Sequence, residues 1–324
     1  MTNNKILIIC DNPRIGGIQR LAQDQFYWFA QNNFKVVLCF MSLSQNVNTF
    51  INRETDLISA SNGTITYMGN KRMASIYNLI QLIRNEHPKI IICHSLRASV
   101  VAFLLGKVLL ERELKVNTCI HQLPAMSAPV QRFRRYLYSQ FSHELFGYSR
   151  AVVDEWSKRF ERGWIFSYSA KRLHIKLLRN GVYLNRITLN QESVNAIREL
   201  CYVGRLTNWK GMDTFITMAR LSCFKEFDVK IAVPEIDPEL VNNLEIEFGN
   251  RLKLFIGKTF NELEIGQGSF LIYPVNYGVS GEIESISINV LESLAAGAKC
   301  VITYGGSRTW PELMETGSLL EIEW

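Results

Sequence analysis

Two positively charged residues lie close together in the second half of the chain, within the segment YVGRLTNWKG at 202–211. Arg205 and Lys210 follow an apolar run with the composition of a strand, so both are expected in the loop that leaves it. An arginine can contact a phosphate through two hydrogen bonds, and a lysine beside it adds a second positive charge. The pair therefore predicts a phosphate-binding loop, whereas either residue taken singly is typical of a solvated loop charge.

Two carboxylates occur further along, in the segment ESISINVLE at 284–292. Glu284 comes just before an expected helix, and Glu292 lies about one turn inside it. A carboxylate accepts hydrogen bonds from neighbouring hydroxyls, so Glu284 could reach a sugar from the loop and Glu292 a ribose from the helix. An acidic residue at a helix start also stabilises the helix dipole, which accounts for Glu284 equally well. Glu292 stands between apolar residues and requires a polar partner.

A pair of glycines marks the first half of the chain. Gly16 and Gly17 come after the apolar run at 5–10, where a helix is expected to begin. Glycines let the backbone approach a ligand closely, and the N–H groups at a helix start favour anions. The full G-x-G-x-x-G spacing is absent, so dinucleotide binding is only weakly indicated and a simple turn is the alternative.

Short apolar strands alternate with amphipathic helices along the chain and would position these residues. Strands are expected at 5–10, 35–40, 64–67, 90–94, 116–121, 144–148, 199–203, 228–233, 252–256, 270–274 and 299–303. Helical crossovers between strands predict parallel sheets covered on both faces. We expect an α/β protein of two doubly wound, Rossmann-like domains, residues 1–185 and 186–324, facing across a cleft at the carboxyl ends of their strands.

The charge of the chain is distributed unevenly. Residues 1–186 carry 25 Lys and Arg against 11 Asp and Glu, whereas residues 187–324 carry 11 against 19. The basic half predicts an anionic partner, namely nucleic acid, an acidic glycan or a membrane, with ordinary solvated surface as the alternative.

Composition also indicates the compartment. The seven cysteines contain no Cys-x-x-Cys pair, so we expect buried small side chains in a reducing environment rather than a zinc site or disulfides. The apolar stretch at 98–106 is about half of the ~20 residues that a membrane span needs, and charges interrupt the N-terminal apolar run. We therefore expect a cytoplasmic globular protein.

Aromatic and basic residues alternate in the segment 130–166. A helix expected at 130–145 carries Phe133, Tyr136, Leu137 and Phe141 on one face and Arg132, Arg134 and Arg135 on its flanks. This composition is typical of a helix lying on an anionic membrane, and packing of the apolar stripe into the core fits at least equally well. With a second stretch around Trp156, Trp164 and Phe166, it favours peripheral contact with the inner face of the plasma membrane.

The motifs taken together resemble family-four retaining glycosyltransferases of the GT-B fold. The resemblance is carried by Gly16-Gly17, Asn180-Gly181-Val182, Gly204-Arg205, Lys210-Gly211, Glu284 to Glu292 with Ala295-Ala296-Gly297, and Tyr304-Gly305-Gly306 with Glu312. It covers nearly the whole chain. Departures include Ser287 where the family has glycine, Arg179 in place of a proline, and a short segment after the last glycine loop.

The resemblance implies roles for individual residues. Arg205 and Lys210 would neutralise the diphosphate of a nucleotide-sugar donor, Glu292 would hold the ribose, and Glu284 would hold the sugar. The backbone after Glu284, at Ser287 and Ile288, and the glycine pair would also approach the donor. His121, at the end of a strand, would contact the transferred sugar, with a purely structural role as the alternative. We interpret His94, which also ends a strand, as structural.

The resemblance implies a hexosyltransferase that needs no metal or other cofactor, and no Asp-x-Asp sequence occurs in the chain. We expect transfer of a sugar from a nucleotide diphosphate to a glycan or lipid-linked acceptor in the synthesis of lipopolysaccharide, O-antigen or capsule. The alternatives are a glycosyltransferase-like subunit that binds nucleotide without turnover, a nucleotide-sugar epimerase on the same fold, and a nucleic-acid-binding module. The last has no recognition motif, so we expect no nucleic acid.

Overall fold

The chain forms two compact units, unit 1 (Met1–Tyr183) and unit 2 (Leu184–Trp324). The computed structural model describes residues 5–12, 16–41, 63–69, 72–106, 114–123, 128–161, 175–184, 187, 198–206, 210–258, 260–274, 283–284, 287–303 and 319–322. For some of these, including Arg132, Arg135 and Glu284, only the backbone is described. None of the described helices is both long enough and apolar enough to cross a membrane.

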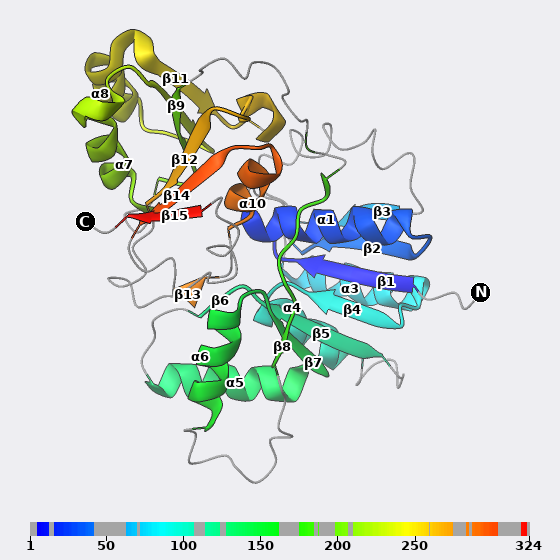
Figure 1. The fold of residues 1–324 in the computed structure, drawn as a ribbon. Coiled ribbons are helices and arrows are strands. Elements are labelled where there is room, and N and C mark those ends of the chain that lie inside the picture. Colours follow the sequence, from blue (N-terminus) through cyan, green and yellow to red (C-terminus); the bar gives the residue numbers. More distant parts are fainter. Residues whose placement is uncertain are drawn as a thin grey trace. The chain divides into compact units, whose positions relative to one another are not determined.

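Unit 1 contains a seven-stranded sheet in the order β3-β2-β1-β4-β5-β7-β8, with every described pair parallel (Figure 1). The strands are β1 (Lys5–Cys10), β2 (Lys35–Phe40), β3 (Gly63–Tyr67), β4 (Ile90–Cys93), β5 (Lys115–Ile120), β7 (Glu144–Gly147) and β8 (Ile175–Leu177), and Gln122–Leu123 forms a short strand β6. The interior strand β1 is buried on both faces from Ile6 to Cys10. Such continuous apolar runs are expected of parallel strands covered by helices on both sides.

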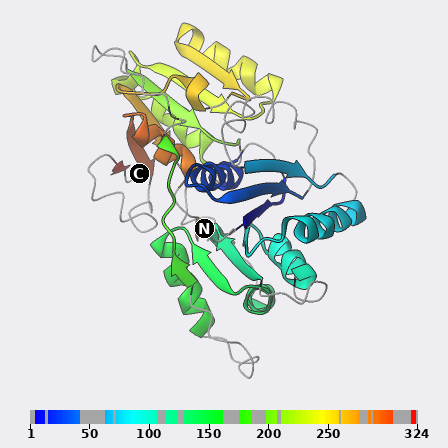
Figure 2. The ribbon, with the colours of Figure 1, turned by 90° about the vertical axis from the view of Figure 1, so that its right-hand side faces the viewer.

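The described residues of unit 1 form five helices. They are α1 (Gly17–Gln31), α3 (Arg72–Glu86), α4 (Leu96–Leu104), α5 (Ala128–Phe141) and α6 (Arg150–Glu161). Alternate residues of β1 enter two separate cores: Ile8 packs with α1 through Phe26, and Leu7 packs with α3 and α4 through Leu79 and Ala98. Figure 2 shows α1 on one face of the sheet and α3 and α4 on the other.

Unit 2 repeats this plan with a six-stranded sheet in the order β11-β10-β9-β12-β14-β15. Its strands are β9 (Glu199–Val203), β10 (Asp228–Val233), β11 (Leu252–Ile256), β12 (Ser269–Tyr273), β14 (Lys299–Thr303) and β15 (Leu319–Ile322), with a short β13 (Ile283–Glu284). Its helices are α7 (Met212–Ala219), α8 (Pro238–Phe248) and α10 (Ile288–Ala295), and the 3₁₀ turns are η4 (Ser222–Phe224), η5 (Gly249–Arg251) and η6 (Phe260–Leu263). One core joins α7 and α8 to β9 and β10, with Phe215 and Leu200 fully buried.

A buried ion pair lies at the amino ends of the unit 2 strands, away from the carboxyl ends where a ligand is expected. The Nζ of Lys230 lies 2.9 Å from Oε2 of Glu199, and these side chains are 3% and 6% exposed. The same ammonium donates to the carbonyl of Leu263 at 2.8 Å. These contacts anchor η6 under β10, and we assign them no role in chemistry.

The α/β class and the two doubly wound parallel sheets confirm the prediction from the sequence. The helix expected at 130–145 ends at Phe141, and Leu145 lies in β7 instead. The chain turns at this point because the backbone N–H of Val116 in β5 donates to Nδ1 of His143 at 3.0 Å, which fixes the entry into β7.

Other expectations about unit 1 are partly wrong. The strand β8 and the helix α6 were not expected, and Trp156 of α6 is buried against Tyr138 with the ring centroids 5.3 Å apart. It therefore packs in the core and offers nothing to a surface, whereas Trp164 and Phe166 lie outside the described residues. Of the six cysteines described, five are buried as expected and Cys223 is exposed.

Candidate functional site

The carboxyl edge of the unit 1 sheet carries a row of polar side chains. Asp11, His94, His121 and Tyr148 each follow directly after a strand, namely β1, β4, β5 and β7. Because these strands are parallel neighbours, their carboxyl ends meet at the same edge of the sheet. The Oγ of Ser95 donates to Oδ1 of Asp11 at 2.7 Å, which ties the ends of β1 and β4 together.

Three of these side chains, His94, His121 and Tyr148, form one hydrogen-bonded chain with Gln25 of α1 and with Cys119. Nε2 of His121 lies 3.0 Å from Nδ1 of His94, and Nε2 of His94 lies 3.0 Å from Oε1 of Gln25. The amide Nε2 of Gln25 donates to the hydroxyl of Tyr148 at 2.7 Å, and this hydroxyl donates to Sγ of Cys119 at 3.1 Å. The structure thus brings His121 and His94 together, and connects both to residues that the sequence analysis had not selected.

Burial keeps this chain uncharged at neutral pH. It lowers the pKa of His94 to about 3, and burial together with the charge of His94 lowers the pKa of His121 well below its ordinary value of 6.5. Burial also raises the pKa of the Cys119 thiol to about 12 and raises the pKa of the Tyr148 hydroxyl well above its ordinary value. Both imidazoles are therefore neutral, with one ring nitrogen protonated in each.

The glycine pair lies at the start of α1, on the same edge. Gly16 is the N-cap residue and Gly17 the first residue of the helix, and no side chain in the described part of the structure caps this end. A Cβ on Gly16 would lie 2.8 Å from Oε1 of Gln19, whose amide nitrogen donates to Asn12 at 3.2 Å. The glycine therefore leaves room for Gln19 to connect the helix start to the end of β1.

In unit 2, Arg205 and Lys210 lie in the loop that follows β9, as the sequence predicted. Arg205 is exposed, and the hydroxyl of Tyr202 donates to its backbone carbonyl at 2.9 Å. Burial raises the pKa of the Tyr202 hydroxyl, so this donor stays protonated. Lys210 is half-buried, and its Nζ donates to the hydroxyl of Tyr273 at 2.7 Å and lies 5.1 Å from the centre of that ring. Tyr202 of β9 thus holds the backbone of Arg205, and Tyr273 of the neighbouring strand β12 holds the ammonium of Lys210.

The turn after Lys210 depends on glycine. Gly211 adopts φ +71°, in the left-handed region, and a Cβ on it would lie 2.1 Å from the carbonyl oxygen of Pro274. No other residue type fits without moving the backbone at the end of β12. The close approach of the two backbones places Lys210 beside Tyr273.

The helix α10 begins beside the end of β9. The amide of Asn289 donates to the carbonyl of Val203 at 3.0 Å, Ser287 is the N-cap and Ile288 the first helical residue. Ser287 makes no side-chain capping bond with any described residue. Glu292 is 3% exposed, one turn further along.

Several predicted residues are not placed. The side chain of Glu284 lies outside the described residues, although its backbone forms β13, and Tyr304–Gly306 and Glu312 are outside them as well. Asn180-Gly181-Val182 follow β8. Among the described residues, no group of three or more His, Cys, Asp or Glu side chains is arranged to hold a metal ion.

The comparisons with known proteins agree with this geometry at the level of the fold. No family model and no curated protein matches the sequence. Among solved structures, the Anabaena protein HepE in complex with UDP-glucose superimposes with a TM-score of 0.69 at 14% identity, covering 94% of this chain and 82% of that one. A glycosyltransferase from Rickettsia africae matches with a TM-score of 0.68 at 13% identity, covering 100% and 85%. The lipopolysaccharide outer core galactosyltransferase WaaB, in its apo form, gives 0.53 at 15% identity, covering 92% and 80%. The chain therefore has the GT-B fold of glycosyltransferases.

Proposed function

We propose that the chain is a retaining glycosyltransferase that uses a nucleotide-diphosphate sugar. The observation that supports this most is the cation pair Arg205 and Lys210, which Tyr202 and Tyr273 hold at the carboxyl edge of the unit 2 sheet. Fixed cations at this position suit a diphosphate, whose negative charge grows as the bond to the sugar breaks. The fold is shared with HepE, which was crystallised with UDP-glucose.

The remaining roles follow the resemblance to family-four enzymes. Glu292, buried in α10, would bind the ribose hydroxyls, and Glu284 would bind the sugar. The backbone N–H groups at Ser287 and Ile288 would approach the donor, as would the glycine pair at the start of α1. His121 would contact the transferred sugar.

Catalysis in this proposal requires no metal ion, because Arg205 and Lys210 supply the positive charge that a cation would otherwise supply. We expect sugar transfer to continue unchanged in the presence of EDTA. Loss of turnover on chelation, with recovery on adding Mg²⁺ or Mn²⁺, would contradict this part of the proposal.

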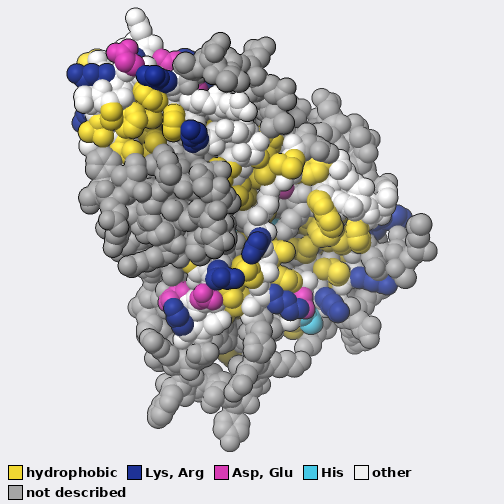
Figure 3. Space-filling view, viewed as in Figure 1, with side chains coloured by type: hydrophobic (Ala, Val, Ile, Leu, Met, Phe, Trp, Pro, Cys, Tyr) yellow, Lys and Arg dark blue, Asp and Glu magenta, His cyan; other side chains and the backbone are white. Residues whose placement is uncertain are grey.

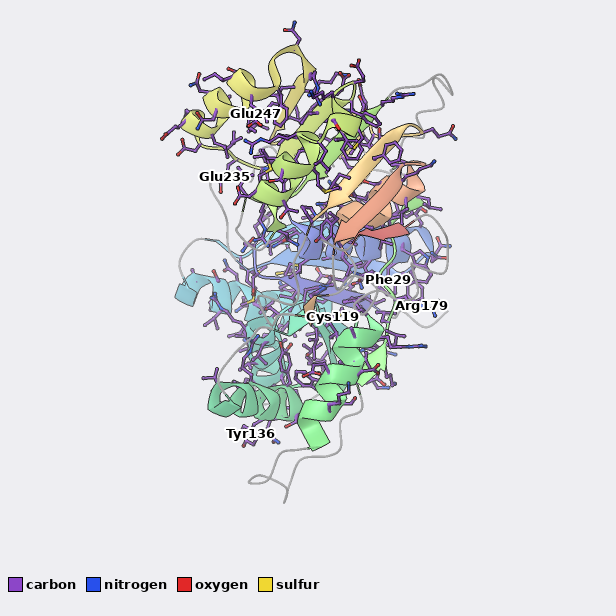
Figure 4. All side chains as sticks on the ribbon, turned by 60° about the vertical axis from the view of Figure 1, so that its left-hand side comes forward. Phe29, Cys119, Tyr136, Arg179, Glu235 and Glu247 are labelled. Carbon is purple, nitrogen blue, oxygen red and sulfur yellow. The ribbon has the colours of Figure 1, made fainter. Side chains whose placement is uncertain are left out.

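The acceptor in this proposal is a lipid-linked or otherwise anionic glycan at the cytoplasmic face of the plasma membrane, in the synthesis of a surface polysaccharide. The helix α5 supports it, because Val130, Phe133 and Tyr136 are 47%, 61% and 42% exposed. These residues recur every three positions in a helix that also carries Arg132, Arg134 and Arg135. Figure 4 shows Tyr136 on the outer side of α5, and Figure 3 shows Lys and Arg side chains beside hydrophobic ones on one face of unit 1.

A thermal-shift screen of nucleotide sugars tests the donor. A ligand present at about 100 times its dissociation constant adds about 2.7 kcal/mol of stability. We expect UDP-sugars or another single donor class to raise the unfolding temperature selectively, and the same donor to release its nucleotide on addition of acceptor. A shift without turnover would favour a non-catalytic subunit, and no shift with any nucleotide would refute the proposal.

A further inference from the structure

We propose that the hydrogen-bonded chain at the edge of the unit 1 sheet fixes His121 as its Nε2–H tautomer, so that Nδ1 accepts a hydrogen bond from a hydroxyl of the substrate sugar. His94 and Gln25 are then positioning residues, which act on the substrate through His121. The inference rests on the proposed function in one respect only, that the substrate is a sugar.

The direction of the chain follows from the amide of Gln25. Its Nε2 can only donate, and it lies 2.7 Å from the hydroxyl of Tyr148, so its Oε1 faces His94 at 3.0 Å. An amide oxygen can only accept, so Nε2 of His94 carries the proton and Nδ1 of the same ring has a lone pair. That lone pair faces Nε2 of His121 at 3.0 Å, which must therefore be protonated.

The inner end of the chain is closed. The hydroxyl of Tyr148 accepts from Gln25 and so directs its own proton to Sγ of Cys119, at 3.1 Å. His94, Tyr148 and Cys119 are at most 3% exposed, so this end of the chain is shielded from water. Figure 4 shows Cys119 within the body of unit 1.

The outer end is the half-buried ring of His121. It lies nearly parallel to the rings of His94 and Tyr148, at centroid distances of 5.2 and 4.8 Å and angles of 22° and 20°, which restricts its rotation. Within the described part of the chain, Nδ1 of His121 has no hydrogen-bond partner. Because burial and the neighbouring His94 disfavour a second proton on this ring, Nδ1 stays an acceptor at neutral pH.

An acceptor at this position selects one kind of substrate group. A neutral lone pair accepts a hydrogen bond from a hydroxyl, whereas an ether or carbonyl oxygen has no proton to donate to it. A site that requires a hydroxyl discriminates strongly against an analogue without it, because the buried polar group is then left unpaired. His121 would therefore recognise a sugar by a free hydroxyl, and a deoxy sugar that lacks this hydroxyl would be a poorer substrate.

Nitrogen-15 NMR of the histidine rings in the ligand-free protein tests the tautomer directly. Protonated and unprotonated ring nitrogens resonate far apart, and spectra of His94→Gln and His121→Gln variants assign the two rings. We expect the protonated signal at Nε2 and the unprotonated one at Nδ1 for both rings, unchanged between pH 6 and 8. A protonated Nδ1 on His121, or a doubly protonated ring in this range, would overturn the proposal.

Two substitutions of His94 separate positioning from packing. Asparagine places its amide near the position of Nδ1 and can keep the bond to His121, whereas glutamine places it near Nε2 and keeps the bond to Gln25. We expect His94→Gln to lower kcat about tenfold relative to His94→Asn, the size of one lost hydrogen bond, with similar KM for UDP-glucose and with mixed tautomers at His121. Equal kcat and equal His121 spectra in the two variants would assign His94 to packing alone.

Titration with UDP-glucose and with UDP separates this inference from the proposed function. A hydroxyl that donates to Nδ1 of His121 should shift that nitrogen signal with UDP-glucose and leave it in place with UDP. Identical spectra with UDP-glucose and with UDP bound would show that no hydroxyl of the sugar donates to Nδ1 of His121. Failure of either compound to bind would count against the proposed donor, and the ligand-free spectrum would still decide the tautomer.

Discussion

The two cations Arg205 and Lys210 of unit 2 show how the position of a residue depends on the neighbours that hydrogen-bond to it. Arg205 is exposed, but its backbone carbonyl accepts from the buried Tyr202, and the ammonium of Lys210 donates to Tyr273. A long, flexible side chain loses less entropy on binding when it is already held, so Tyr273 would favour binding of a diphosphate by Lys210, whereas Tyr202 holds only the backbone of Arg205.

Arg205→Ala and Lys210→Ala should each remove most transfer activity. A charge-assisted contact contributes about 1.5–3 kcal/mol, so kcat/KM should fall by roughly tenfold to more than a hundredfold, with little change in the unfolding temperature. Steady-state kinetics with a purified donor measures this. Lys225→Ala is the matched control, because this exposed lysine precedes β10 at the opposite edge of the sheet. Near wild-type turnover in both test variants would contradict the assignment of Arg205 and Lys210 to diphosphate binding.

Tyr273→Phe keeps the ring beside Lys210 and removes only the hydroxyl. We expect the affinity for UDP to fall about threefold to tenfold, the range for one hydrogen bond to a charged group that is partly replaced by water. Isothermal titration calorimetry gives the dissociation constant. Tyr77→Phe, at a 61% exposed tyrosine of α3, should bind UDP as the wild type does. If Tyr273→Phe also binds as the wild type does, Tyr273 does not position Lys210.

At the scale of elements, α5 buries apolar side chains on one face and exposes apolar side chains on another. Tyr138 is buried and Phe141 packs edge-on against Phe103, with the ring centroids 5.6 Å apart, while Val130 and Phe133 face outward. The expectation that Phe133 and Phe141 share one face is therefore only partly right. The helix has an apolar stripe for its own core and a second, exposed stripe.

Replacing Arg132, Arg134 and Arg135 with glutamine should weaken binding to anionic vesicles. Basic residues at an anionic surface contribute about 1 kcal/mol each, screened over about 8–10 Å, so up to ~3 kcal/mol should be lost. Cosedimentation with phosphatidylserine-containing liposomes at low salt measures the affinity, and high salt should release the wild type. Lys158→Gln on α6 serves as the control. Equal partition onto neutral and anionic vesicles would indicate that these arginines are ordinary surface residues.

At the scale of the whole molecule, the neutral histidines make stability depend on pH. The pKa of His94 falls from 6.5 to about 3 on folding, so the unfolded chain binds a proton first as the pH drops. Stability is therefore fully present above pH 6.5 and is lost as the pH falls below it. His121 adds to this in the same direction.

We expect acidification from pH 6.5 to 5.5 to lower the free energy of unfolding of unit 1 by about 1 kcal/mol through His94 alone. Urea denaturation at both pH values measures it. A His94→Gln variant should be less stable at pH 7 and should have a shallower dependence on pH. The same slope in the variant and in the wild type would show that other groups cause the acid sensitivity.

The sequence by itself determined the fold class and the loops that carry the charges. Strands buried on both faces are rich in apolar residues, which is why β1, β2, β9 and β10 could be predicted with correct bounds even though β9 and β10 include the charged residues Glu199 and Lys230. Arg205, Lys210 and the glycine pair could be proposed as binding residues because loops after strands in this class of fold carry ligands, and their residue types suit phosphate.

The tertiary structure alone decided which residues support the site. Tyr273 lies 63 positions from Lys210, and Tyr148 lies 123 positions from Gln25, so no local pattern connects them. The burial of Trp156 could not be predicted from the sequence either. An aromatic residue on an amphipathic helix gives the same sequence pattern whether it faces a core or a membrane. Hydrophobic periodicity indicates that a side chain is buried. The residue that it contacts depends on which strands are neighbours in the sheet, and that spatial order is a property of the whole sheet.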